Sequence, residues 1–156
     1  MSLKPLAVNA KEIAAAINER DWPGLTARCI YDLAFTDVAT SEKFENVQEF
    51  IGFLTNWTKI FPDLSVSLVM ANSTLSTEIL ELRFEGTQTG PFPVMDGTIP
   101  ATDRDVVWQA CIIFDLETTN ARKIKGARIY YDITTLLDQL AVALDANAEQ
   151  DKEIRV

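Results

Sequence analysis

The hydrophobic residues of the chain follow two periods in turn, a helical one and a strand-like one. Helical spacing is found after Asn9, after Pro23 and after Asn46, and each of these residues is suited to the start of a helix. Asn46 and Glu49 match a capping box, so we expect the third helix to start there and to end at Pro62. Its inner face is expected to carry five large apolar residues: Phe50, Phe53, Leu54, Trp57 and Phe61.

From Leu64 onward the apolar positions alternate, which predicts β-strands. We expect four of them, at residues 64–70, 76–87, 105–116 and 122–132. The third is apolar on both faces and should therefore lie at the centre of a sheet. A last helix, capped by Thr134, is predicted to contain Leu136, Leu137, Leu140 and Leu144. Helices followed by an antiparallel sheet and a closing helix indicate an α+β fold.

Composition and charge narrow the possible functions. At 156 residues the chain fits one domain, which we place at 1–145, with a polar tail at 146–156. The net charge of −9 argues against nucleic acid and membrane partners. Met1–Pro5 lacks the apolar run of a signal peptide, and no stretch is long enough to span a bilayer, so a cytoplasmic location is expected.

Metal chemistry is not expected either. The chain contains no histidine, and its two cysteines, Cys29 and Cys111, are far apart in the sequence. Zinc sites use closely spaced cysteine and histidine ligands, and neither pattern is present. Two reduced, buried thiols are the favoured state of these cysteines.

Four short motifs, in order along the chain, resemble those of the SnoaL-like polyketide cyclases, a branch of the NTF2-like superfamily. They are Phe61-Pro62-Asp63-Leu64, Gly86-Thr87-Gln88-Thr89-Gly90-Pro91-Phe92, Ile99-Pro100-Ala101-Thr102-Asp103-Arg104, and Tyr130-Tyr131-Asp132 followed by Leu136-Leu137-Asp138-Gln139-Leu140. The family usually has histidine at the position of Gln88 and glycine at that of Asp103.

The resemblance implies a cone-shaped α+β fold in which helices wrap a curved antiparallel sheet around one apolar pocket. Members commonly form homodimers through the convex face of the sheet. Some close polyketide rings by an intramolecular aldol reaction without any cofactor, using a carboxylate as acid and base. The expected ligand is therefore an apolar, carbonyl-bearing small molecule.

Asp132 is the first candidate for this acid and base. Arg128, Tyr130 and Asp132 alternate along the fourth strand and should project from one face. An aspartate desolvated in an apolar cavity has a raised pKa, which suits proton abstraction next to a carbonyl. Two other roles remain open for Asp132, because it could cap the last helix or pair with Arg128.

Gln109 and Cys111 have the spacing of the glutamine and histidine that the family carries on its third strand. Gln109 is a candidate pocket donor or acceptor, unless it bonds a buried neighbour. Cys111 has no histidine to activate it, so a small core residue is favoured. In this register the family's aspartate falls nearer Arg128 than Asp132, and Arg128 would then bind a ligand carboxylate.

The remaining candidates are expected to line the pocket or its mouth. Asp37 corresponds to a position that often holds a polar pocket residue in the family, although it could also be a solvated loop residue. Gln88 occupies the place of the family's histidine. Trp57 and Phe92 are either pocket walls or ordinary core residues, and 92–97 is expected to form a flap at the mouth.

Three functions follow from these assignments. The first is a cofactor-free cyclase or isomerase with Asp132 as the acid and base, and with Gln109, Tyr130 and Asp37 orienting the substrate. The second is a non-catalytic domain for small-molecule binding or assembly. The third is an epoxide hydrolase of the limonene type, with Arg128 between Asp132 and Asp37.

Overall fold

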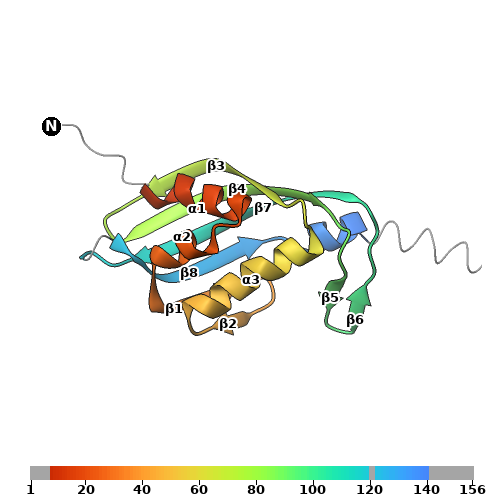
Figure 1. The fold of residues 1–156 in the computed structure, drawn as a ribbon, viewed down its shortest axis with the longest axis horizontal. Helices are drawn as coiled ribbons and strands as arrows, with labels where there is room; N and C mark the ends of the chain where they lie inside the picture. Colours follow the sequence, from red (N-terminus) through yellow and green to blue (C-terminus); the bar gives the residue numbers. More distant parts are fainter. Residues whose placement is uncertain (1–7, 120–121, 141–156) are drawn as a thin grey trace, which may run out of the picture.

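In the computed structural model, residues 8–119 and 122–140 are described. They form a six-stranded sheet with helices across one face and a separate two-stranded hairpin at one end (Figure 1). The helices are α1 (Val8–Glu19), α2 (Trp22–Ala27) and α3 (Val47–Ile60), and residues 133–140 are also helical. The predicted Leu144 and the tail 146–156 lie outside the described residues.

The large sheet has the strand order β2-β1-β8-β7-β4-β3. Neighbouring strands are antiparallel except β1 and β8, which run parallel. Its strands are β1 (Cys29–Asp37), β2 (Glu42–Phe44), β3 (Ser65–Ser73), β4 (Thr77–Thr87), β7 (Asp105–Leu116) and β8 (Ile124–Tyr131). The hairpin consists of β5 (Phe92–Val94) and β6 (Gly97–Ile99).

The α+β class and the four predicted strands are confirmed, and β7 lies inside the sheet between β4 and β8 as expected. The sequence did not predict β1 and β2. The helical spacing that follows Pro23 continues through Cys29 and Ile30, but α2 ends at Ala27 and the chain turns directly into β1. Leu33, Phe35 and Asp37 alternate as buried residues along that strand.

The sheet has an inner face under the helices and an outer face on the opposite side. On β7 the inner positions Val106, Trp108, Ala110 and Ile112 are buried, whereas the residues between them are at least partly exposed. Asn46 caps α3 as predicted, because its side chain accepts a hydrogen bond from the backbone N–H of Glu49. The inner face of the sheet and the apolar side of α3 thus form one core.

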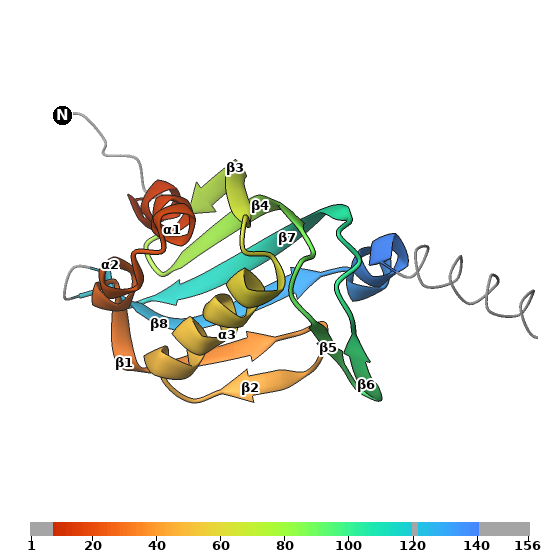
Figure 2. The ribbon, with the colours of Figure 1, turned by 45° about the vertical axis from the view of Figure 1, so that its right-hand side comes forward.

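The two ends of the sheet differ in what lies beside them (Figure 2). At one end, the α1 end, lie α1, α2 and the turn between β3 and β4. At the other, the hairpin end, lie β5, β6 and the helix at residues 133–140. The parallel strands β1 and β8 both finish at the hairpin end. No helix of the described residues is long and apolar enough to cross a lipid bilayer.

Candidate functional site

Aromatic side chains fill the space between α3 and the sheet at the hairpin end. Trp57, near the end of α3, is the centre of this cluster and is itself only half-buried. Its ring contacts five others at centroid distances of 5.4 to 6.3 Å. These rings are Phe53, Phe61, Phe92, Trp108 and Tyr131. The hairpin end of the core is therefore strongly aromatic.

One carboxylate lies inside this apolar region. Asp37, the last residue of β1, is only 2% exposed, and its Cα pairs with that of Ile129 on the parallel strand β8. Two residues farther along β8, Tyr131 projects from the same inner face and donates its hydroxyl hydrogen to Asp37 Oδ2 at 2.9 Å. The backbone N–H of Ala39 donates to Oδ1 at 3.1 Å.

The phenol of this pair is a donor rather than a base. Burial raises the pKa of Tyr131 far above its ordinary value, and the charge of Asp37 raises it further. Tyr131 therefore keeps its proton across the physiological range. Asp37, by contrast, can accept about four hydrogen bonds as a carboxylate and receives two, so acceptor positions remain for a ligand.

Asp132 is not the buried base that the sequence suggested. It is exposed and caps the helix at residues 133–140, accepting from the backbone N–H of Thr134 at 3.0 Å and of Thr135 at 3.1 Å. The Thr135 hydroxyl also donates to it, and this bond is the main reason why the pKa of Asp132 is lowered. The capping role, which the sequence left open, is the one observed, so Thr134 is not the cap.

Three further candidates face away from the aromatic cluster, on the outer face of the sheet. Gln109 is exposed, Cys111 is half-buried, and Tyr130 is 41% exposed and pairs with Cys111 across β7 and β8. Burial raises the pKa of the Cys111 thiol, as does the nearby Glu81 carboxylate, so it stays protonated and weakly nucleophilic. None of the three reaches Asp37, since the sheet separates them.

Arg128 is also on the outer face, where it forms an ion pair with Asp115 at 2.8 Å. The hydrogen bond to Asp115 raises the pKa of Arg128. Both residues line an open concavity of about 560 Å³ on that side of the sheet. The cluster of Asp37, Arg128 and Asp132 that limonene-type epoxide hydrolysis requires is therefore not assembled.

Gln88 is fully buried and holds the two ends of the segment that carries the hairpin. Its Nε2 donates to the carbonyls of Gly90 at 2.8 Å and Pro100 at 3.2 Å, with a longer contact to Ile99. Its Oε1 accepts from the backbone N–H and the hydroxyl of Thr102, at 2.9 and 2.6 Å. All its polar atoms are bonded, so Gln88 positions the segment instead of contacting a ligand.

The hairpin brings Phe92 onto the aromatic cluster. Phe92 is 5% exposed and its ring lies 5.8 Å from that of Trp57. The segment stays close to α3 because Gly90 donates its N–H to the carbonyl of Ile60. A Cβ at Gly90 would lie 1.9 Å from the carbonyl oxygen of Lys59, so only glycine fits there. The predicted flap is thus a short hairpin whose base is fixed.

Sequence reasoning missed Tyr131 and chose its neighbour Tyr130. The apolar alternation of Ala127, Ile129 and Tyr131 along β8 is the signal that identifies the inner face. Among residues 8–119 and 122–140, no group of three or more cysteine, aspartate and glutamate side chains could hold a metal ion. Asp37 and Tyr131 bring a carboxylate and a phenol hydroxyl to the aromatic cluster.

Comparisons with known proteins agree with this geometry at the level of the fold. The model of the family "SnoaL-like polyketide cyclase" matches residues 7–140. A SnoaL-like polyketide cyclase from Agrobacterium tumefaciens superposes with a TM-score of 0.70 at 19% identity, covering 88% of this chain and 99% of that one. No curated protein matches the chain.

Two other solved structures show how widely the fold is used. A Catenulispora acidiphila protein with a ketosteroid isomerase-like fold has a TM-score of 0.65 at 15% identity, covering 82% of this chain and 88% of that one. An epoxide hydrolase from M. tuberculosis, described as LEH-like, has a TM-score of 0.61 at 15% identity, covering 90% and 92%. At such identities the likeness shows a common fold, and the chemistry must be argued from the site.

Proposed function

Since the chain belongs to the SnoaL-like polyketide cyclase family, we propose that it is a cofactor-free cyclase or isomerase in which Asp37 is the acid and base. The observation that carries this proposal is the carboxylate of Asp37, 2% exposed among aromatic side chains and bonded to the hydroxyl of Tyr131. Its substrate is an apolar small molecule with a carbonyl group. The proposal keeps the carboxylate mechanism expected from the sequence and moves it from Asp132 to Asp37.

The reaction starts when the substrate binds and breaks the hydrogen bond from the Tyr131 hydroxyl to Asp37. The Asp37 carboxylate removes a proton from the carbon next to the carbonyl, and the electron pair of that C–H bond moves to form the enolate. Tyr131, which stays protonated, donates a hydrogen bond to the enolate oxygen. The two side chains thereby serve as base and oxyanion donor.

In a cyclisation, the enolate carbon then attacks a second carbonyl of the same molecule. One carbon–carbon bond forms and the second carbonyl oxygen becomes an alkoxide. Asp37, now a carboxylic acid, returns its proton to this alkoxide, so the enzyme is regenerated without net change. The surrounding rings hold the substrate in a folded conformation and keep water from competing for the enolate.

Exchange of deuterium at the acidic carbon of a β-diketone tests the first step directly. In D2O the protein should accelerate incorporation into an apolar β-diketone above the buffer rate, as followed by NMR. Binding of the diketone without any acceleration would contradict the proposal.

Binding of the diketone without faster deuterium exchange would support a second function, that of a binding domain without catalysis. The observation in its favour is the inner face of β7 and β8 near the cluster. Trp108, Ala110 and Ile129 are buried there and carry no ionisable group that could transfer a proton. Such a domain would bind the same class of ligand through its aromatic rings and leave it unchanged.

We also propose that the protein forms a homodimer through the outer face of the sheet. Neighbouring strands expose Ile79, Val107 and Tyr130 there, at 42%, 37% and 41%. Tyr130→Glu is expected to convert the dimer to a monomer in sedimentation velocity, because a charge would be buried in the interface. Met95→Glu, at the fully exposed tip of the hairpin, should leave the dimer intact. A monomeric parent protein would refute this arrangement.

A further inference from the structure

At the α1 end, far from Asp37, lies a second buried carboxylate that the proposed reaction does not use. Within residues 8–119 and 122–140, the buried side-chain oxygens without a hydrogen-bond partner are Ser73 Oγ, Glu78 Oε2 and Glu117 Oε1. Their residues lie at the end of β3, at the start of β4 and directly after β7, so all three belong to this end of the sheet. Orphan polar atoms of this kind are rare and costly.

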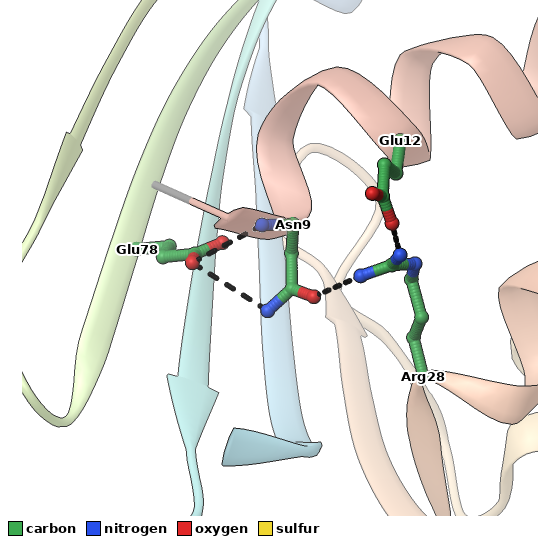
Figure 3. A network of polar contacts seen from close by, with 4 residues as sticks. All are labelled: Asn9, Glu12, Arg28 and Glu78. Carbon is green, nitrogen blue, oxygen red and sulfur yellow. Dashed lines mark hydrogen bonds and ion pairs between the residues drawn. The ribbon is translucent and has the colours of Figure 1, made fainter. Parts of the chain in front are cut away.

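Glu78 is completely buried, yet its hydrogen bonding is weak. Oε1 accepts two long bonds from Asn9 at the start of α1, from the backbone N–H at 3.4 Å and from Nδ2 at 3.5 Å (Figure 3). Oε2 has no partner. A carboxylate in such a place loses its hydration and receives little in return.

The contacts of Glu78 continue through Asn9 to two charged residues. Asn9 Oδ1 accepts a hydrogen bond of 2.5 Å from Arg28, and Arg28 forms an ion pair with Glu12 on α1 (Figure 3). The charges that act on Glu78 are those of Arg28 and of Arg122, which precedes β8. Ser73 on β3 and Phe114 on β7 are its neighbours in the sheet and carry no charge. These hydrogen bonds and the ion pair connect the start of α1 to the sheet.

The neutral form of Glu78 fits this site better than the ionised form. The side chain is completely buried, and its bonds from Asn9 are long, so a charge there would be poorly compensated. Ser73 is its direct neighbour in the sheet, yet Ser73 Oγ forms no hydrogen bond with Oε2. A carboxylic acid at Glu78 keeps the bonds from Asn9 to Oε1 and places no charge in the interior.

We propose that Glu78 is a proton-operated clasp that holds the start of α1 against the sheet when it is neutral and loosens it when it ionises. The direction of this pH dependence follows from the linkage between proton binding by Glu78 and docking of α1. Desolvation raises the pKa of Glu78 despite the opposing effects of Asn9, Arg122 and Arg28. Because the docked state binds the proton more tightly, docking is strongest below the ordinary pKa of a glutamate and weakens as pH rises through the raised value.

Hydrogen exchange of the α1 amides, measured by NMR at residues 10–16 on the full chain between pH 5 and 8, tests the clasp. After correction for the intrinsic exchange rate, protection in the parent protein is expected to fall by up to about tenfold per pH unit within the window. Glu78→Gln should abolish this fall and keep the high protection at pH 8.

The matched control is Glu81→Gln, which removes a carboxylate from the outer face of the same strand and should leave the pH dependence as in the parent. Equal pH dependence in the parent and Glu78→Gln would overturn the clasp. If Glu78→Gln does not fold, the carboxyl ¹³C shift of Glu78 in the parent protein decides. If the pH titration of this shift has a higher midpoint than those of exposed glutamates, the proposal is supported. An equal or lower midpoint overturns it.

Discussion

Asp37→Asn is expected to slow deuterium exchange and ring closure by about a thousandfold, because it removes the proposed general base and nearly keeps the shape of the side chain. The amide oxygen can still accept the hydrogen bond of Tyr131, so the aromatic cluster should keep its arrangement. Ligand affinity, measured by quenching of tryptophan fluorescence, should change little. A loss of kcat without loss of binding is the signature of an acid–base residue.

Two aspartates provide controls for this experiment. Asp32 lies on the same strand and is exposed, so Asp32→Asn should retain the parental kcat. Asp132→Asn should do so as well, because asparagine caps a helix nearly as well as aspartate and the residue lies outside the cluster. Parental activity in Asp37→Asn together with a large loss in Asp132→Asn would return the catalytic role to Asp132.

Gln88→Met is expected to lower the free energy of unfolding by about 3 kcal/mol, since it leaves several buried hydrogen-bonding groups unpaired. Methionine has nearly the volume of glutamine, so packing changes little while the bonds to Gly90, Pro100 and Thr102 are lost. The hairpin should also lose its fixed position, and Phe92 its contact with Trp57. Urea denaturation followed by tryptophan fluorescence measures both effects.

Gln109→Met is the matched control for this substitution. Gln109 is exposed on the outer face of the sheet, where the same change should alter stability by no more than about 0.5 kcal/mol. Similar stability losses in the two variants would mean that the bonds of Gln88 contribute nothing specific. Gln88→His restores the residue usual in the family. Because histidine has fewer hydrogen-bond donors and acceptors than glutamine, this variant should recover only part of the stability that Gln88→Met loses.

The sequence predicted the long elements well, because their hydrophobic periods are long and regular. The N-cap at Asn46, the alternation of buried residues along β4 and the central position of β7 are all observed, although the Glu49 side chain accepts from the N–H of Glu45 and not from that of Asn46. The strand β1 was missed because only one residue, Arg28, separates the end of α2 at Ala27 from its first residue, Cys29. Cys29 and Ile30 therefore extended the helical pattern as plausibly as they began a strand.

The site was harder to predict because its location depends on one-residue distinctions. In a strand, adjacent residues face opposite sides, so choosing Tyr130 instead of Tyr131 places the phenol outside the cone. The same alternation sends Gln109 and Arg128 to the outer face. If β8 continued past Tyr131, Asp132 would lie on the outer face, as Arg128 does. The strand ends at Tyr131, however, and Asp132 caps the following helix.

Asp37 was found by family position alone, because its burial depends on β1, whose neighbour β8 is distant in the sequence. Asp37 and Tyr131 are 94 positions apart, and no local pattern links them. Gln88 was recognised only as a substitution for histidine. Its role became visible once the carbonyls of residues 90 and 100 and the backbone of Thr102 were located around it.

The parallel pairing of β1 with β8 has a consequence for folding during synthesis on the ribosome. Strands β3, β4, β7 and β8 are neighbours both along the chain and in space, apart from the hairpin inserted before β7, so they can assemble as they emerge. The strand β1 is synthesised early but has no partner in the large sheet other than β2 until β8 leaves the exit tunnel. During that interval Asp37, at the end of β1, is a hydrated side chain. The newborn chain therefore buries Asp37 against Tyr131 only after β8 has been translated.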